Sequence, residues 1–316
     1  MDPDDFDEDQ RKTNQRRMSM YSAHALLVAK EVDNTFVAHT AFSNGLTALD
    51  RAFQLGRELS VPQGVMVIGP TGSGKTTLNK YFLASLPPST LFEQGLGAIT
   101  LRLQERPVLG RLVSTALTKL RYPFPKVSDQ TVSAKRSILI ESLNAKGTRL
   151  ILVDEAGHMC GPGVRKAHAA KTGNEITEFF CELMDEAHVA LGLSGNSQLE
   201  ALDRIDPALA ARVVTRERFR DFDLDGIWHG FLKAFKDQCK AFDLSFFCSE
   251  GVPALLHAAT GGNARRFKAL AIEAVLVAID KDAKALDREI LEQAFRLVNG
   301  TATMATNPFA TARVAP

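Results

Sequence analysis

The strongest constraint in this sequence is the run from Val65 to Thr76, which reads Val-Met-Val-Ile-Gly-Pro-Thr-Gly-Ser-Gly-Lys-Thr. A short apolar segment leads into Gly69, four residues follow, and Gly74-Lys75-Thr76 completes the pattern. Glycines let a loop curl so that its backbone N–H groups face phosphate oxygens, and the helix expected to follow adds the positive end of its dipole. The sequence therefore predicts a phosphate-binding loop of the Gly-x-x-x-x-Gly-Lys-Thr type.

Each part of this loop has an expected role in binding ATP and Mg²⁺. The Lys75 ammonium is expected to reach the β- and γ-phosphates, and the Thr76 hydroxyl to reach the metal. A glycine-rich turn without a ligand is the alternative, which the agreement of strand, loop, Lys-Thr pair and helix disfavours. The predicted cradle consists of Gly69, Pro70, Thr71, Gly72, Ser73, Gly74, Lys75, Thr76 and Thr77.

Composition limits the class of protein. The chain is 45% apolar and 24% charged, as ordinary globular proteins are, and its net charge of +1 excludes strong overall attraction to nucleic acid but not a local basic patch. The four cysteines lack C-x-x-C spacing, so we expect buried, reduced thiols and no zinc site. We expect no membrane span and no secretory signal, and therefore a cytoplasmic location.

Alternating patterns predict an α/β fold with a parallel five-stranded sheet covered on both faces. The expected strands are residues 64–68, 98–102, 149–153, 189–194 and 213–219, with helices near 75–86, 107–120, 130–145, 174–188 and 196–211. After residue 221 the pattern becomes helical only, over 224–242, 249–260, 263–280 and 287–298.

These patterns divide the chain into four segments. Residues 1–40 are expected to form a mobile charged arm and an N-terminal helix, and 41–221 the nucleotide-binding domain, which begins with an amphipathic helix around 43–59. Residues 222–299 are expected to form a small all-helical lid domain, and 300–316 a disordered tail.

A second motif is Arg149-Leu-Ile-Leu-Val-Asp154-Glu155, in which an apolar strand ends in two carboxylates. At the carboxyl end of a strand beside a phosphate loop, Asp154 is expected to hold Mg²⁺ directly or through water. Glu155 is expected to orient and deprotonate the attacking water. A solvated Asp-Glu pair is the alternative.

Polar and cationic residues farther along the chain are candidates for the same site. Asn196, or second to it Ser194, follows the fourth strand and is expected to position the attacking water. Arg212, with Arg204 as an alternative, is expected to neutralise the γ-phosphate of a neighbouring subunit. The alternative for either arginine is a surface ion pair with Asp203 or Asp206. Arg265, after Gly261-Gly-Asn-Ala, is expected to reach the nucleotide from the lid, or to face solvent.

Together these features resemble an AAA+ ATPase over about residues 40–298. More narrowly, the chain resembles the TniB/TnsC/MuB group of transposition regulators. The matching segments are Asp154-Glu-Ala-Gly-His158, residues 195–213 with Leu-Ala-Ala-Arg-Val at the end, and Trp228-His-Gly-Phe-Leu-Lys-Ala-Phe. One departure is the loop Thr-Gly-Ser-Gly-Lys-Thr, where many TniB proteins have an asparagine.

The resemblance implies an ATP-dependent regulator of DNA transposition. Such proteins assemble on double-stranded DNA as homo-oligomeric rings or helical filaments, recruit and activate a transposase, and disassemble after ATP hydrolysis. A target-selection protein is a further candidate partner. The resemblance places Lys75, Thr76, Asp154, Glu155 and Asn196 in one subunit and Arg212 or Arg204 in the next.

Two basic segments are candidates for contact with DNA phosphates. The first follows the second strand and contains Arg102, Arg106 and Arg111; the second, in residues 161–173, contains Arg165, Lys166, His168 and Lys171. A few such contacts per subunit, repeated along a filament, give salt-sensitive and sequence-tolerant binding. A solvated charged loop is the alternative. His158 is interpreted as a structural or nucleotide-sensing polar contact, and Trp228 as a core residue.

Two other functions remain open at this point. One is another AAA+ DNA-remodelling role, such as helicase loading or origin recognition, for which no helicase-partner segment is recognisable. The other is a scaffold in which nucleotide only gates oligomerisation and hydrolysis is negligible.

Overall fold

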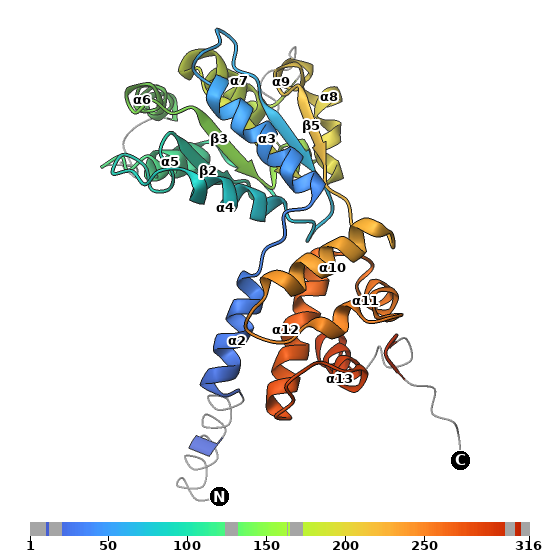
Figure 1. Ribbon diagram of the computed structural model, residues 1–316. Helices are drawn as coiled ribbons and strands as arrows, with labels where there is room; N and C mark the ends of the chain where they lie inside the picture. Colours follow the sequence, from blue (N-terminus) through green and yellow to red (C-terminus); the bar gives the residue numbers. More distant parts are fainter. Residues whose placement is uncertain are drawn as a thin grey trace, which may run out of the picture. The chain divides into compact units, whose positions relative to one another are not determined.

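The computed structural model describes residues 11–12, 21–123, 132–162, 164, 173–300 and 307–310. Contacts divide the chain into two compact units. One unit is Thr40–Arg220, and the other combines Met1–His39 with Asp221–Pro316. Figure 1 shows the elements of both.

The Thr40–Arg220 unit is built on a parallel five-stranded sheet with the strand order β2-β3-β4-β1-β5, so the predicted α/β fold is confirmed. Apolar strands buried on both faces are typical of parallel sheets, and every residue of β1, β3 and β4 is buried. The strands are β1 (Val65–Ile68), β2 (Ala98–Arg102), β3 (Leu150–Asp154), β4 (Ala190–Gly195) and β5 (Thr215–Arg218).

Helices cover both faces of this sheet (Figure 1). Alternate strand residues such as Met66 and Val153 share one core cluster with residues of α5, α6 and α7. On the opposite face, the side chains of Leu49 in α3 and Leu152 in β3 fill the space beside Gly192 of β4, which has no side chain of its own. The helices of this unit are α3 (Thr40–Leu55), α4 (Lys75–Ser85), α5 (Leu109–Lys119), α6 (Val132–Ala145) and α7 (Glu175–Ala187).

The helical segment predicted near 196–211 is interrupted. It consists of the 3-10 turn η2 (Ser197–Ala201), α8 (Leu202–Ile205) and α9 (Pro207–Arg212). Proline disfavours helical geometry at the residue before it, and Asp206 has φ −142°. The Asp206 carboxylate instead accepts a hydrogen bond from Leu209 N at 3.0 Å and so caps α9.

The second unit is helical, as predicted for residues after 221. Its elements are α10 (Gly226–Gln238), the 3-10 turn η3 (Ser245–Cys248), α11 (Val252–Thr260), α12 (Ala264–Asp280) and α13 (Arg288–Asn299). Trp228 is fully buried and its ring stacks on Phe231, which agrees with its interpretation as a core residue.

The N-terminal helix α2 (Ala23–Asn34) belongs to this helical unit. Val28 and Val32 of α2 lie in the same core cluster as the residues of α10 to α13. The predicted segment 1–40 is therefore not separate from the lid over these residues. Residues 1–10 and 13–20 of the predicted arm lie outside the described residues.

The C-terminal prediction is wrong for residues 307–310. Phe309 is fully buried and its ring lies 6.2 Å from that of Phe295. Arg288 Nε donates a hydrogen bond to Phe309 O at 2.9 Å. These four residues pack on the helical unit, whereas we expected a disordered tail.

The cysteine prediction holds only in part. Cys239 is buried and Cys248 is exposed, which contradicts the expectation of four buried thiols. Burial raises the pKa of the Cys160 and Cys181 thiols to about 11, so both are protonated at neutral pH. Among the described residues, no helix is both long and apolar enough to cross a bilayer.

Candidate nucleotide-binding site

The predicted phosphate loop connects β1 to α4 at the carboxyl end of the sheet. Gly72 and Gly74 have φ values of 88° and 100°, a backbone region that side chains disfavour. A Cβ atom on Gly69 would lie 2.5 Å from Phe219 O, so this position also excludes a side chain. The three glycines are therefore required by the shape of the loop itself.

Hydrogen bonds fix the loop to the sheet and to its own lysine. Gly69 N donates to Gly195 O at 3.1 Å, which ties the loop to β4. Lys75 Nζ donates to Gly69 O at 2.7 Å and to Pro70 O at 2.8 Å, so the ammonium lies over the loop at the N-terminus of α4. An ammonium and a helix N-terminus together attract phosphate. Among the described residues, Ser73 Oγ is buried without a hydrogen-bond partner and remains available to a ligand or water.

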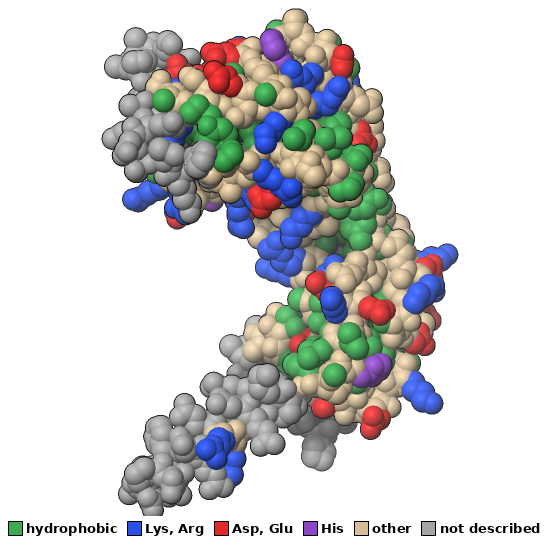
Figure 2. All heavy atoms as spheres, turned by 90° about the vertical axis from the view of Figure 1, so that its left-hand side faces the viewer, with side chains coloured by type: hydrophobic (Ala, Val, Ile, Leu, Met, Phe, Trp, Pro, Cys, Tyr) green, Lys and Arg blue, Asp and Glu red, His purple; other side chains and the backbone are tan. Residues whose placement is uncertain are grey.

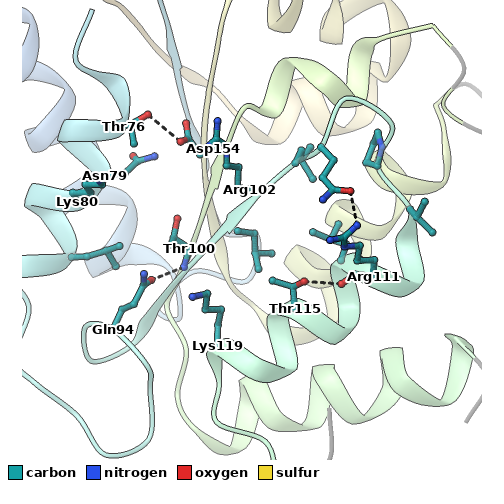
Figure 3. Close-up of a pocket in the computed structure, with 17 residues that line it drawn as sticks. Thr76, Asn79, Lys80, Gln94, Thr100, Arg102, Arg111, Thr115, Lys119 and Asp154 are labelled. Atoms are coloured by element: carbon teal, nitrogen blue, oxygen red, sulfur yellow. Dashed lines mark hydrogen bonds between the residues drawn. The ribbon is translucent and has the colours of Figure 1, made fainter. Parts of the chain in front are cut away.

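The Asp154 carboxylate connects the loop helix to the neighbouring strands. Thr76 Oγ1 donates to Asp154 Oδ2 at 3.0 Å, and Ser194 Oγ donates to Asp154 Oδ1 at 3.1 Å. Asn79 Nδ2 in turn donates to Ser194 Oγ at 3.0 Å. Figure 3 shows Thr76 and Asp154 facing each other. The geometry joins the two strongest sequence motifs in one site.

Thr76 and Asp154 fit a Mg²⁺ ion that is held together with nucleotide. Both supply hard oxygen ligands, and Mg²⁺ is usually held by one or two carboxylates with substrate phosphates and water. Within the described ranges, no group of three or more His, Cys, Asp or Glu side chains is arranged to hold a metal ion by itself.

Glu155 directly follows β3 in an unusual backbone conformation. Its φ is 54° and its ψ is 35°, a left-handed geometry that is uncommon for residues other than glycine and clusters at functional sites. Its side chain is 39% exposed, and its Oε1 lies 3.8 Å from Arg102 Nη2. Arg102, a candidate for DNA contact, therefore lies beside the candidate catalytic carboxylate.

Ser194 and Asn196, the two candidates for positioning the attacking water at the end of β4, differ in burial and in hydrogen-bond partners. Ser194 is buried and supports the Asp154 carboxylate. Asn196 is partly exposed, and its Oδ1 accepts a hydrogen bond from Gln198 N at 3.0 Å. No other hydrogen bond of the Asn196 side chain occurs among the described residues, so its amide N–H₂ group remains available to a water or a phosphate.

Two arginines are candidates for contact with the γ-phosphate of a neighbouring subunit, and they differ in their partners within this chain. Arg212 forms a two-pronged ion pair with Asp185 of α7, with Nη2 at 2.8 Å and 3.1 Å from the two carboxylate oxygens. Arg204 is exposed and has no hydrogen-bond or ionic partner in the part of the chain that is described. The alternative of pairing with an aspartate therefore applies to Arg212, although its partner is Asp185 and not Asp203 or Asp206.

The remaining predicted residues lie in different parts of the chain. Thr71 and Thr77 are exposed at the loop and at the first turn of α4, and Arg106 is exposed after β2. Arg265 is the second residue of α12 in the helical unit, and His158 lies near Glu155, where its Nδ1 is 3.3 Å from Leu103 O. Arg165, Lys166, His168 and Lys171 lie outside the described residues.

Sequence reasoning missed Asn79 and Asp185. Asn79 follows Thr76 by three positions, which places both on one face of α4, and this spacing was a usable signal. Asp185 and Arg212 are on different helices, and nothing in the local sequence indicates that they meet.

The family described as "Bacterial TniB protein" matches residues 28–220, which is more than half of the 316-residue chain. No match was found among curated proteins.

The fold is similar to solved structures of AAA+ proteins. The Aeropyrum pernix ORC2 protein in ADPNP-ADP complexes aligns with a TM-score of 0.58 and 17% identity, covering 83% of this chain and 67% of that chain. The Aeropyrum pernix ORC1 protein in complex with DNA has a TM-score of 0.53 and 18% identity, covering 83% and 66%. Cdc6p from Pyrobaculum aerophilum has a TM-score of 0.55 and 16% identity, covering 82% and 68%. This chain thus spans about two thirds of the length of each, and the likeness shows an AAA+ fold.

Proposed function

Because this chain belongs to the TniB family, we propose that it is an ATP-dependent, DNA-binding regulator of DNA transposition. In this proposal, ATP binding drives assembly of copies on double-stranded target DNA. The assembly recruits and activates a transposase, and hydrolysis of ATP disassembles it.

The observation that carries the ATPase part is the hydrogen bond of 3.0 Å between Thr76 Oγ1 and Asp154 Oδ2. This hydrogen bond joins the phosphate loop to the end of β3, where Asp154 and Glu155 lie, in one site. Lys75 and the loop N–H groups hold the triphosphate, and Thr76 and Asp154 hold Mg²⁺, which polarises the γ-phosphate when bound. Glu155 accepts a proton from the attacking water, and the amide of Asn196 positions that water.

DNA contact is proposed for exposed arginines at and after the end of β2, together with the segment around Arg165, Lys166 and Lys171. Arg106 is exposed and has no ionic partner among the described residues, so its charge is available to a DNA phosphate. The Arg102 side chain is 74% exposed despite its contact with Glu155. Repeated phosphate contacts of this kind explain how a chain with a net charge of +1 binds DNA in an assembly.

Electron microscopy of the purified protein with duplex DNA tests this proposal. With a non-hydrolysable ATP analogue and Mg²⁺ we expect ordered polymers along the duplex, and with ADP we expect few or none. DNA affinity should fall steeply as salt rises, since phosphate contacts release counterions. Closed rings that form without DNA, or ring formation only around a helicase, would contradict the transposition role and favour helicase loading.

We expect Arg212→Ala to leave ATP binding by the monomer intact and to lower ATP hydrolysis by the assembly at least about 100-fold, since an arginine that neutralises a neighbour's γ-phosphate has a large effect. Asp185→Asn should raise hydrolysis by the assembly, because it releases Arg212 from its own chain. Steady-state turnover at saturating DNA measures both effects.

The matched control for Arg212→Ala and Asp185→Asn is Arg216→Ala. It removes an arginine of β5 that forms an ion pair with Asp203. It should leave turnover within about twofold of wild type. Arg204→Ala decides between the two candidates: a large loss with Arg204→Ala and none with Arg212→Ala would transfer the role to Arg204. If a monomer hydrolyses ATP as fast as the assembly, the shared site is wrong.

A further inference from the structure

A groove of about 460 Å³ runs between α4 and α5 over the edge strand β2. Figure 3 shows α4 side chains on one wall, α5 side chains on the other and Thr100 of β2 between them. One end of the groove is formed by Thr76 and Asp154, the two residues proposed to hold Mg²⁺. The groove therefore begins where the γ-phosphate of bound ATP is expected and continues away from the phosphate loop.

The groove is lined by more positive than negative charge. Among its described lining residues, the cations are Lys80, Arg102, Arg111 and Lys119, and the one carboxylate is Asp154, which already accepts hydrogen bonds from Thr76 and Ser194. Figure 2 looks at the side of this unit on which Figure 1 places α5 and α6, and Lys and Arg side chains gather on that face.

Two of these cations have acidic partners that lie outside the groove. Lys119 Nζ is 2.9 Å from Glu93 Oε2, and Arg102 Nη2 is 3.8 Å from Glu155 Oε1. Lys80 has no hydrogen-bond or ionic partner within the described ranges. The groove therefore retains uncompensated positive charge on its α4 wall.

Two glutamines add hydrogen-bond donors to the groove. Gln94 Oε1 accepts a hydrogen bond from Thr100 N at 3.1 Å, and Gln104 Oε1 accepts one from Arg111 Nη1 at 3.0 Å. Because both amide oxygens are already bonded, each side chain has its N–H₂ group left to offer a ligand. A lining of cations and amide N–H groups matches an oxyanion that accepts several hydrogen bonds.

We propose that this groove binds inorganic phosphate and that the phosphate formed by ATP cleavage leaves through it, an inference that rests on the proposed ATPase function. In the cleavage, the water oxygen bonds to the γ-phosphorus, the bond from that phosphorus to the β–γ bridging oxygen breaks, and its electron pair leaves with ADP. The water proton passes to Glu155. The free phosphate then lies at the Thr76 and Asp154 end, and cations on both walls lower its electrostatic energy along the groove.

Phosphate titration of the ADP- and Mg²⁺-loaded protein by calorimetry, at constant ionic strength, tests binding directly. The test variant is Lys80→Gln/Lys119→Gln, which removes one cation from each wall. We expect its phosphate affinity to be about tenfold lower than that of wild type. The control is Lys135→Gln/Lys233→Gln, which removes two lysines outside the groove, on α6 and α10, and should stay within about twofold.

Rapid-mixing kinetics test the exit route. Chemical quenching measures cleavage of ATP, and a fluorescent phosphate sensor measures release. In Lys80→Gln/Lys119→Gln we expect unchanged cleavage and several-fold slower release, because the anion loses favourable charge along its path. Equal affinity and equal release in the test and control variants would overturn the inference.

Two further measurements distinguish phosphate binding in the groove from DNA binding there and from phosphate binding in the phosphate loop. If duplex DNA affinity falls in the test variant while phosphate affinity is unchanged, the groove binds the DNA backbone and the inference is wrong. Repeating the phosphate titration in a Lys75→Ala background, without nucleotide, disables the phosphate loop as a rival anion site. If phosphate binding in this background still depends on Lys80 and Lys119, the groove is a phosphate site. If wild type also cleaves no ATP, the proposed ATPase function fails, but phosphate binding by the groove stands.

Discussion

We expect Lys75→Ala to abolish ATP binding in the nucleotide concentration range that saturates the wild-type protein. The ammonium is the cation of the phosphate loop, and its hydrogen bonds to Gly69 O and Pro70 O at 2.7 and 2.8 Å place it over the cradle. A triphosphate in this loop loses its main positive contact, and we expect affinity to fall about 1,000-fold, or ~4 kcal/mol.

Titration with a fluorescent ATP analogue measures this loss, with Lys135→Ala as the control because Lys135 is on α6, away from the loop. Thermal unfolding of both variants without nucleotide shows whether the fold is intact. We expect ATP to raise the melting temperature of wild type and of Lys135→Ala but not of Lys75→Ala, since only a ligand that binds the native state stabilises it. Unchanged ATP affinity in a folded Lys75→Ala protein would remove the basis of the proposed function.

Local patterns account for the parts of this structure that could be predicted from sequence. The loop between β1 and α4 is specified by glycines whose positive φ values a side chain would resist, so the motif determines its own shape. The meeting of Thr76 with Asp154 was also predictable, because the carboxyl ends of parallel strands lie at one edge of the sheet.

The features that sequence reasoning missed depend on contacts between distant segments. Asp185 and Arg212 are 27 positions apart on separate helices, and their pairing follows from how α7 packs near α9. Phe309 lies in a segment of mostly polar and small residues, and its burial follows from packing against Phe295 of α13, which no local pattern indicates. The groove between α4 and α5 has the same origin, since Lys80 and Lys119 lie on different helices.

Glu155→Gln should separate ATP binding from ATP hydrolysis. The substitution keeps the size of the side chain and the backbone N–H that donates to Asp154 Oδ1 at 3.1 Å, but it removes the group that accepts a proton from water. General-base catalysis typically contributes 10²- to 10⁴-fold, or ~3–5 kcal/mol of barrier. We therefore expect at least about a 100-fold fall in turnover, while ATP affinity stays within a few-fold of wild type.

The same variant decides whether hydrolysis resets the assembly. If ATP cleavage drives disassembly, Glu155→Gln polymers on DNA should persist long after wild-type polymers have dissociated, as followed by light scattering after dilution. Glu141→Gln, an exposed glutamate on α6, is the matched control and should behave as wild type in turnover and in polymer lifetime. If Glu155→Gln also leaves both quantities unchanged, Glu155 is not the catalytic base. In a scaffold that nucleotide only gates, wild-type turnover would already be negligible, and the two proteins would dissociate from DNA at the same rate because no cleavage step distinguishes them.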